Sequence, residues 1–359
     1  MKHFRTAAAV LASGALLLTA VQSAQAAPDG AYHHPKGAPL KALAERSDLL
    51  FGTAVDTTAL VEDRTYRKIT AREFNSVTAE NVMKWETLQP QPGVYDFTEG
   101  DALVAFAQRN DQQVRGHTLL WHNQLPAWLT SGVTGGSITA DELREILREH
   151  ITTVVQHYEG EIYQWDVVNE VFEEDGSYRN SLWYQHLGPS YIADAFRWAH
   201  QADPDVKLYF NDYNVEGVNA KSTAYYNLAR ELRAEGVPVH GFGIQGHLGT
   251  QYGFPGDIPA NLKRFADLGM ETSFTEVDVR SVMPADATKL ATQADYFRRM
   301  LDACLGSPQC TSFTIWGFAD QYSWVPYTFE GQGSANIYDE SYRPKPSYFA
   351  IRKELAEGR

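Results

Sequence analysis

The sequence has little cysteine, and its basic residues are outnumbered by acidic ones. Its 359 residues include 2 cysteines and 31 Lys and Arg against 45 Asp and Glu, which gives a formal net charge of −14. Two cysteines cannot build a disulfide-rich framework. The shortage of cations argues against nucleic-acid binding, because Lys and Arg supply most of the affinity for phosphate backbones. It also disfavours an anionic membrane surface. A neutral or weakly charged polymer remains permitted as a partner.

The two cysteines are Cys304 and Cys310. In an oxidising compartment they are expected to pair, and so short a loop would add about 2 kcal/mol of stability on the chain-entropy estimate. Two unpaired thiols are the alternative. A redox-catalytic pair is disfavoured because the spacing is not C-x-x-C. We predict a Cys304–Cys310 disulfide with a structural role.

Long hydrophobic runs are absent except near the N-terminus. Lys2 and Arg5 precede an almost wholly apolar stretch from Ala7 to Ala20, and Ala24-Gln25-Ala26 fits a cleavage site that follows it directly. A membrane anchor is the competing interpretation, but the apolar stretch is too short to span a bilayer. We therefore predict a signal peptide over residues 1–26 and a secreted, extracellular protein that is not attached to a membrane.

The chain after residue 26 has no low-complexity run, proline-rich linker or sharp shift in composition. Residues 27–40 are predicted to form a flexible leader because they are rich in proline and glycine. Residues 41–359 are predicted to form one catalytic domain, since a single α/β barrel commonly exceeds about 250 residues. We expect this domain to act as a monomer.

Short apolar runs rich in β-branched and aromatic residues alternate with longer amphipathic segments. The predicted strands are Leu50–Asp56, Ser76–Asn81, Gln113–Trp121, Tyr163–Glu170, Lys207–Asn211, Gly241–Leu248, Thr272–Val279 and Ser312–Phe318. The predicted helices are Asp101–Arg109, Ala140–His157, Ile192–Gln201, Ala220–Glu235, Pro259–Leu268, Leu290–Leu305 and Ser347–Ala356. Strands joined by helical crossovers form a parallel sheet, and eight such units close into a (β/α)8 TIM barrel. A doubly wound open sheet is the alternative, but no glycine-rich phosphate loop follows the first strand.

Polar and aromatic side chains gather where seven of the eight predicted strands end. These groups are costly to bury unless they are hydrogen-bonded. They are Glu80, Asn81, Lys84, His117, Trp121, His122, Asn123, Asn169, Glu170, Asn211, Asp212, Tyr213, Gln245, His247, Glu276, Asp278 and Trp316, with Trp324 in the loop beyond. A barrel places its active site at the carboxyl ends of the strands. The pattern therefore predicts one catalytic site at that end.

Two carboxylates of this set, Glu170 and Glu276, end the fourth and seventh predicted strands, which lie nearly opposite in an eight-stranded ring. A carboxylate pair around a scissile bond is the machinery of glycoside hydrolysis. Trp121, Trp316 and Trp324 offer flat apolar faces on which sugar rings can stack. The sequence thus favours an enzyme acting on a neutral polysaccharide. A catalytically silent, sugar-binding barrel is an alternative whose expected mark, loss of one carboxylate, is absent.

Two other kinds of catalytic site have less support. His117, His122 and His247 with nearby carboxylates could hold a metal ion as in barrel metallohydrolases. However, the first predicted strand ends in Ala54-Val55-Asp56, without the paired histidines usual in such enzymes. A nucleophilic serine would need a G-x-S-x-G elbow, which is missing. We predict no metal and no cofactor.

Four segments resemble glycoside hydrolase family 10. They are Thr78-Ala79-Glu80-Asn81-Val82-Met83-Lys84-Trp85, Gly116-His117-Thr118-Leu119-Leu120-Trp121-His122, Trp165-Asp166-Val167-Val168-Asn169-Glu170 and Thr275-Glu276-Val277-Asp278. Members of this family are endo-β-1,4-xylanases on a (β/α)8 barrel, and the resemblance extends from about Leu40 to Leu355. Val277 stands where many members have Leu, a change of volume that leaves the catalytic pattern intact. The resemblance implies an endo-xylanase whose partners are xylan and xylo-oligosaccharides; a barrel enzyme acting on cellulose or mixed β-glucan is the alternative.

The resemblance also implies a role for each matching residue. It makes Glu170 the acid/base and Glu276 the nucleophile of a retaining mechanism, with His247 and Asp278 hydrogen-bonded around the nucleophile. Asn169 would contact the sugar 2-hydroxyl, and Tyr213 would lie on the aglycone side. The groups implied to line the glycone side are Glu80, Asn81, Lys84, His117, Trp121, Asn169, Gln245, His247, Trp316 and Trp324. Chemically, Glu276 must be ionised to attack, whereas Glu170 must carry a proton for the leaving oxygen.

Overall fold

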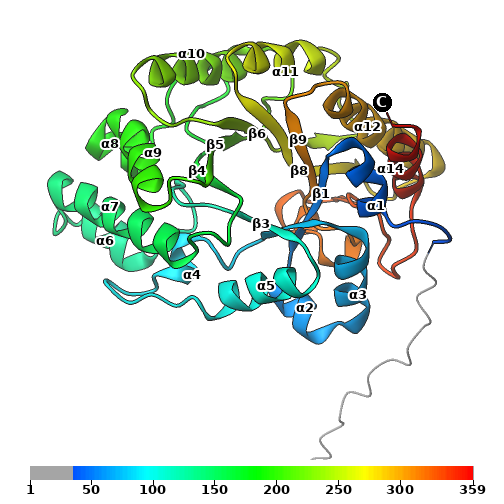
Figure 1. Ribbon diagram of the computed structural model, residues 1–359, viewed down its shortest axis with the longest axis horizontal. Coiled ribbons are helices and arrows are strands. Elements are labelled where there is room, and N and C mark those ends of the chain that lie inside the picture. The colour runs from blue at the N-terminus through cyan, green and yellow to red at the C-terminus, as the bar shows by residue number, and fades with distance from the viewer. Residues whose placement is uncertain (1–34, 359) are drawn as a thin grey trace, which may run out of the picture. The chain divides into compact units, whose positions relative to one another are not determined.

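Eight parallel strands close into a ring around which the helices are arranged (Figure 1). The computed structural model describes residues 35–358. The predicted signal peptide and most of the predicted leader lie outside the described residues. The (β/α)8 barrel predicted from the alternation of strands and helices is confirmed, because β1 pairs with both β2 and β9, and β9 pairs with β8 to close the ring.

The ring strands lie close to the predicted ranges. They are β1 (Leu50–Val55), β2 (Ser76–Ala79), β3 (Gln113–Gly116), β4 (Gln164–Asn169), β5 (Lys207–Asp212), β6 (Gly241–Ile244), β8 (Glu271–Val282) and β9 (Cys310–Ile315). Most end one or more residues before the predicted boundary. Many of the polar residues therefore lie at or just beyond the strand ends, where their side chains can reach into a common space above the ring.

The prediction of one continuous strand over Gly241–Leu248 was wrong. This segment divides into β6 and the short β7 (His247–Gly249), separated by Gln245 and by Gly246 at a φ of 78°. Strand β7 pairs in parallel with the outer part of β8, where His247 is opposite Asp278. Strand β8 is also longer than predicted, and beyond the ring it pairs with the antiparallel β10 (Gln332–Gly333). Glu276 accordingly lies inside β8 and not at its end.

Seven predicted helices are confirmed within a few residues, and the connections contain further helices. The helices that follow ring strands are α2 (Thr57–Glu62) and α3 (Arg64–Glu73), α5 (Thr98–Arg109), α7 (Ala140–His157), α9 (Ser190–Ala202), α10 (Ala220–Ala234), α11 (Ile258–Asp267), α12 (Ala287–Leu305) and α14 (Pro346–Glu357). The shorter helices are α1 (Leu40–Ala44), η1 (Glu45–Ser47), α4 (Trp85–Leu88), α6 (Ala127–Thr134), α8 (Leu182–Leu187), η2 (Asp320–Tyr322) and α13 (Val325–Thr328). Helix α3 was not predicted because its buried face includes Thr70 and Glu73, so few apolar residues mark it in the sequence.

Helix α7 shows how local sequence sets an element. Thr139 and Glu142 form a capping box at its start, which satisfies N–H groups that the first turn leaves without partners. Leu147, Ile151 and Val154 recur at helical spacing and are completely buried. The helix therefore begins and packs as its sequence pattern predicts.

Apolar and polar side chains are segregated by the barrel wall. The core between helices and sheet includes stacked rings such as Phe51 with Phe74 and with Phe313. Inside the ring, by contrast, Arg115 of β3 reaches Asn211 of β5 at 3.3 Å and the carbonyl oxygen of Thr275 in β8 at 3.5 Å. A charged group in this position ties opposite walls of the barrel together beneath the carboxyl ends of the strands.

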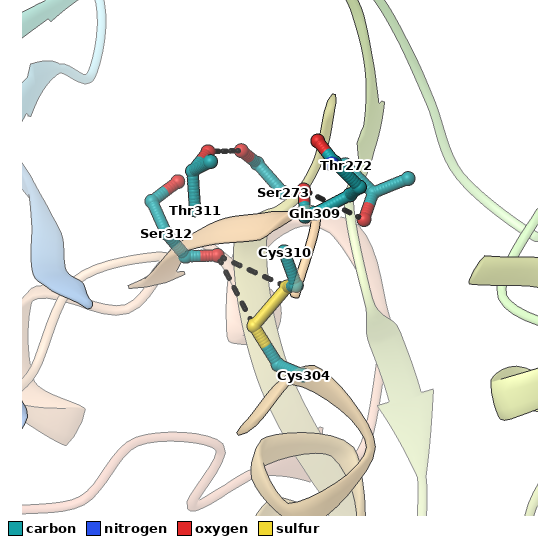
Figure 2. The surroundings of a disulfide bond; sticks show 7 residues. All are labelled: Thr272, Ser273, Cys304, Gln309, Cys310, Thr311 and Ser312. Carbon is teal, nitrogen blue, oxygen red and sulfur yellow. Dashed lines mark hydrogen bonds between the residues drawn. A yellow bond between two sulfur atoms is a disulfide. The ribbon is translucent and has the colours of Figure 1, made fainter. Parts of the chain in front are cut away.

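The two cysteines form the predicted disulfide (Figure 2). It joins Cys304, near the end of α12, to Cys310, the first residue of β9, with Cα atoms 5.2 Å apart. Both sulfur atoms lie within 4 Å of the carbonyl oxygen of Ser312, at 3.8 and 3.9 Å. The bond therefore lies at the amino end of β9, opposite the end where the polar residues gather. Across residues 35–358, no helix combines the length and apolar character needed to cross a bilayer.

Candidate active site

A cleft of about 660 Å³ opens at the carboxyl ends of the ring strands. It brings together every predicted catalytic and sugar-binding residue except Asp278, which lies fully buried beneath it. The cleft residues from the predicted set are Glu80, Asn81, Lys84, His117, Trp121, Asn169, Glu170, Tyr213, Gln245, His247, Glu276, Trp316 and Trp324. Residues from strands β2 to β9 thus meet in one space, although they are scattered over more than 240 positions of the sequence (Glu80 to Trp324).

Glu276 lies in a dense set of hydrogen-bond donors at the floor of the cleft. Asn211 Nδ2 donates to its Oε1 at 2.7 Å, and His247 Nε2 donates to its Oε2 at 3.2 Å. Burial alone would raise the pKa of Glu276, but the hydrogen bond from His247 and the positive charges of neighbouring histidine and arginine side chains lower it to about 2. Glu276 is therefore ionised at neutral pH.

The other ring nitrogen of His247 is used as well. Its Nδ1 donates to Asp278 Oδ2 at 3.0 Å, and the same oxygen accepts from Trp324 Nε1 at 2.7 Å. Burial acts to lower the pKa of His247, yet the charges and hydrogen bonds of Asp278 and Glu276 raise it to about 10. His247 is thus an imidazolium between two carboxylates, and both of its N–H groups donate.

Glu170 is in a different environment. Trp121 Nε1 donates to its Oε2 at 2.9 Å and Gln245 Nε2 donates to its Oε1 at 3.1 Å. The nearest histidine nitrogen, His122 Nδ1, is 3.9 Å away. These donors are neutral side chains of tryptophan and glutamine, so they orient the carboxyl without the cationic contact that Glu276 has.

The backbone of Glu170 adopts a left-handed conformation with φ of 58°. A non-glycine residue in this region is strained and persists only where its surroundings hold it in place. Its N–H donates to the carbonyl of Asn211 at 2.9 Å, and its carbonyl accepts from Arg179 Nε at 2.8 Å. The next N–H, of Val171, donates to the hydroxyl of Tyr225 at 3.0 Å. These contacts hold the backbone of Glu170, whose side chain lines the cleft.

Side-chain amides connect the surroundings of the two glutamates. The amide of Asn211 that binds Glu276 also lies 2.9 Å from the amide of Asn169, and the amide end of Asn169 is 3.4 Å from Oε1 of Glu170. Asn169 and Asn211 are almost completely buried. Because both belong to adjacent strands, β4 and β5, their spacing is set by the sheet.

Two contributors to this network, Arg115 and Asp166, were missed as site residues from the sequence, whereas Asn211 was predicted at the end of the fifth strand. Arg115 forms a buried ion pair with Asp166, and His117 Nδ1 lies 2.8 Å from the second oxygen of that carboxylate. The available signal was an Arg and an Asp inside otherwise apolar strands, since charged groups are rarely buried unless paired. The network holds the His117 ring 3.9 Å from Glu276.

The glycone end predicted from the family pattern contains Glu80, Lys84 and Trp121. Lys84 Nζ donates to Asn81 Oδ1 at 3.0 Å and lies 5.1 Å from the centre of the Trp121 ring. Burial lowers the pKa of Lys84, while the carboxylates of Glu276, Glu80 and Glu170 oppose that effect. Burial, with the charge of Asp56, raises the pKa of Glu80 to about 7. Hydrogen-bonding groups and a flat ring thus border this part of the cleft.

Tyr213 also borders the cleft. Its hydroxyl accepts from Arg179 Nη2 at 3.1 Å, and Lys221 Nζ lies 3.6 Å from the centre of its ring. Lys221 is itself fully buried, 2.8 Å from Asp212. A second hollow of about 520 Å³ shares Asn214, His247 and Arg280 with the main cleft. The two hollows therefore adjoin at these three residues, and Asn214 and Arg280 are cleft-lining residues that were not predicted.

The three histidines considered as metal ligands do not form a common centre. His117 lies against Asp166, His122 faces Glu170, and His247 contacts Glu276 and Asp278. Within residues 35–358, no group of three or more His, Cys, Asp or Glu side chains has a metal-binding arrangement. The donor set is instead organised around two carboxylates in one cleft.

The barrel is closed, and its cleft holds one ionised glutamate and a second glutamate that accepts from neutral donors. This combination of fold and site indicates a glycoside hydrolase. Comparison with known sequences is specific: the pattern described as Glycosyl hydrolase family 10 matches residues 39–354. The chain belongs to glycosyl hydrolase family 10.

Individual relatives agree with that assignment. The chain is 44% identical over 325 residues to endo-1,4-beta-xylanase B of Thermotoga neapolitana, covering 89% of this chain and 92% of that one. It is 43% identical over 302 residues to an endo-1,4-beta-xylanase of Agaricus bisporus, covering 84% and 89%. The crystal structure of xylanase 10B from Thermotoga petrophila in complex with xylobiose superimposes with a TM-score of 0.86 at 43% identity, covering 90% and 99%.

Proposed function

We propose that this protein is an endo-1,4-β-xylanase that hydrolyses internal xylosidic bonds of xylan with retention of configuration. The observation that supports it best is the contrast between two carboxyls of one cleft, Glu276 with a pKa lowered to about 2 and Glu170 among neutral donors. The family membership and the xylanase relatives support the choice of substrate.

In the first step, the Glu276 carboxylate attacks the anomeric carbon and forms a glycosyl ester. The bond to the leaving oxygen breaks, and that oxygen takes the proton of Glu170. The ester no longer carries the negative charge of Glu276, so Glu170 is then suited to accept a proton from water. Water attacks the same carbon, the ester bond breaks, and Glu276 leaves as a carboxylate. Two inversions give net retention.

Surrounding groups assist at defined points of this sequence. The donors Asn211 and His247 hold the Glu276 oxygens in place and keep them ionised before attack. Asn169, between the two glutamates, is positioned for the sugar 2-hydroxyl, a contact that strengthens in the transition state. Trp316 and Trp324 supply apolar faces for the pyranose rings.

The preference for xylose over glucose would come from the tight glycone end. Glu80 and Lys84 lie near one another there, and Trp324 is fixed by its hydrogen bond to Asp278. A hydroxymethyl group on the sugar would need space next to these side chains. Related structures solved with xylobiose and with xylotriose support binding of xylo-oligosaccharides.

The test compares soluble xylan with a soluble cellulose derivative and measures new reducing ends and product lengths. Short and intermediate xylo-oligomers should appear rapidly from xylan, and proton NMR of the first product should show the β-anomer. Activity mainly on the cellulose derivative would contradict the proposed substrate but leave the proposed mechanism standing. A first product in the α-configuration would refute retention, and silence on both polymers would favour a binding-only barrel.

The proposal includes export and a monomeric state. The charged start, the apolar stretch and the A-x-A pattern of residues 1–26 support cleavage near Ala26. Sequencing of the N-terminus of protein recovered from the culture medium tests this, and protein retained inside the cells would contradict it. Light scattering of the mature protein tests for one chain per particle.

A further inference from the structure

The turn between β6 and β7 carries one contact for each of the two site carboxyls. Gln245 Nε2 donates to Glu170 Oε1 at 3.1 Å, and His247 Nε2 donates to Glu276 Oε2 at 3.2 Å. Gly246 lies between them, at a φ of 78°. Because the two donors are separated by one residue, any rotation of this turn moves both contacts together.

A buried carboxylate holds the middle of the turn. Glu216, from the loop between β5 and α10, accepts a hydrogen bond at 3.2 Å from the backbone N–H of Gly246. Glu216 is only 4% exposed. Burial raises the pKa of Glu216, and the backbone N–H groups and the charge of His247 act against that rise. Burying a carboxyl group is costly unless it is hydrogen-bonded, so the bond from Gly246 is needed by Glu216 as well as by the turn.

Glu216 is in turn fixed by helix α11. Asn261 Nδ2 donates to the carbonyl oxygens of Val215 and Glu216 at 2.7 and 3.0 Å, and Arg264 Nε donates to Asn261 Oδ1 at 2.7 Å. Asn261 is completely buried. The loop that presents Glu216 is thus attached to a rigid element, and this element does not line the main cleft.

The neighbouring residues of the turn are held by the sheet, but Gly246 is not. The N–H of Gln245 donates to the carbonyl of Asp212, and the N–H of Glu276 donates to the carbonyl of Gln245, each at 2.9 Å. The turn also packs directly on β8, since a Cβ at Gly246 would come within 3.1 Å of Val277. The bond from Gly246 to Glu216 therefore supplies the restraint that the sheet does not.

We propose that Glu216 is a positioning residue for both carboxyls: by holding the N–H of Gly246, it sets Gln245 against Glu170 and His247 against Glu276. This inference rests on the proposed function. Glu216 acts through the turn, and its role is to fix the two donors in the geometry that the reaction needs.

The test uses Glu216→Ala, which removes the acceptor, and Glu216→Gln, whose amide oxygen can accept the same bond. Glu73→Ala is the matched control, because Glu73 is also fully buried and accepts a backbone N–H, from Leu40 at 2.9 Å. Glu73 precedes β2 and therefore lies at the opposite end of the barrel from the cleft. Binding-competent molecules are counted by calorimetric titration with xylotriose, and kcat is expressed per competent molecule.

We expect kcat of Glu216→Ala to fall by about 100-fold with little change in KM, since small displacements of catalytic groups have effects of this size. Glu216→Gln should recover most of the loss. Glu73→Ala should lower the Tm and leave kcat unchanged. A loss in Glu216→Ala no larger than that of Glu73→Ala would overturn the proposal, as would failure of Glu216→Gln to recover activity.

Amide hydrogen exchange at Gly246 and His247 tests the same proposal without turnover. Exchange should accelerate in Glu216→Ala and not in Glu216→Gln or Glu73→Ala, and equal rates in all four proteins would refute the anchoring role. This measurement also separates the two hypotheses. A wild type that is silent on xylan refutes the proposed function, whereas the exchange rates still decide the role of Glu216.

Discussion

His247 bridges two carboxylates of one strand: its Nε2 lies 3.2 Å from Glu276 Oε2 and its Nδ1 lies 3.0 Å from Asp278 Oδ2. Glu276 and Asp278 are two positions apart on β8, so their side chains share a face. The imidazolium, with its pKa raised to about 10, stabilises the charge of Glu276, whose pKa is lowered to about 2. Each of the two groups therefore favours the charged form of the other.

Replacing Glu276 by alanine removes the group proposed to attack the sugar. Glu276→Ala should lower kcat/KM for xylan and for aryl xylobiosides alike by about 10⁴-fold or more, because both substrates need the nucleophile. Azide, a small anion, should enter the vacated space and convert an activated aryl β-xylobioside into an α-glycosyl azide. Glu271→Ala, on the same strand but at the amino end, should keep its activity. Substantial residual hydrolysis by Glu276→Ala would remove Glu276 from its proposed role.

Replacing Glu170 by alanine should separate substrates by their leaving groups. Xylan has a poor leaving group that must be protonated, so Glu170→Ala should lose about 10²–10⁴-fold on xylan. Formation of the glycosyl ester from an aryl xylobioside with an acidic phenol should be far less affected. The rate of this step is measured as the burst of released phenol in rapid-mixing experiments. Equal losses on the two substrates would count against Glu170 as the acid.

The acid limb of the pH profile should report the contact between His247 and Glu276. Because the pKa of Glu276 is lowered to about 2, wild-type kcat/KM on an activated substrate should persist well below the ordinary carboxyl range. In His247→Asn the charged donor is lost, and the acid limb should move upward by about 1–2 pH units. His157→Asn, in a surface contact of α7 with Asp101, is the control. An unshifted limb in His247→Asn would show that other groups keep Glu276 ionised.

The same pair should affect stability within a defined pH window. The lowered pKa of Glu276 stabilises the fold above its ordinary value of 4.5, and this contribution is lost as the pH falls toward about 2. The raised pKa of His247 stabilises the fold fully below its ordinary value of 6.5, and this contribution is lost as the pH rises through about 10. The difference in Tm between wild type and His247→Asn should therefore be largest between about pH 4.5 and 6.5. A difference that does not vary with pH would contradict the linkage.

Removing the disulfide should affect stability and not catalysis. Replacing Cys304 and Cys310 by alanine opens a short loop, and the free energy of unfolding should fall by about 2 kcal/mol. Because Cys310 starts β9 whereas Trp316 follows its end, kcat should not change. Denaturant unfolding with and without reductant measures the effect, and reductant should have no further effect on the double variant. A marked fall in kcat would mean that the bond shapes the cleft.

The fold could be predicted from the sequence because each strand and helix of the barrel has its own hydrophobic period in the local sequence. Helix α7 was predicted at its observed limits, because apolar residues recur there at helical spacing. The break between β6 and β7 was not predicted, because Gly246 allows a positive φ that no apolar pattern signals. Helix α3 was not predicted either, because its buried face has few apolar residues and so gives no clear apolar pattern.

The site residues at the strand ends could be predicted, but those beneath them could not. Glu170 and Glu276 stand out as acidic residues after or within apolar strands. Glu216 does not, because its importance comes from a contact with Gly246, 30 positions away. Such contacts depend on which distant segments pack together, and a single sequence does not show which side chains will then meet.

The sequence alone determined the architecture, the end of the barrel that carries the site and the two carboxyls within it, because hydrophobic period and residue type are local properties. Only the tertiary structure shows what keeps Glu276 ionised. The pKa of Glu276 depends on burial, on the hydrogen bond from His247 and on nearby positive charge. These interactions weaken with distance, so they act on Glu276 only once β3, β5, β7 and β8 have come together.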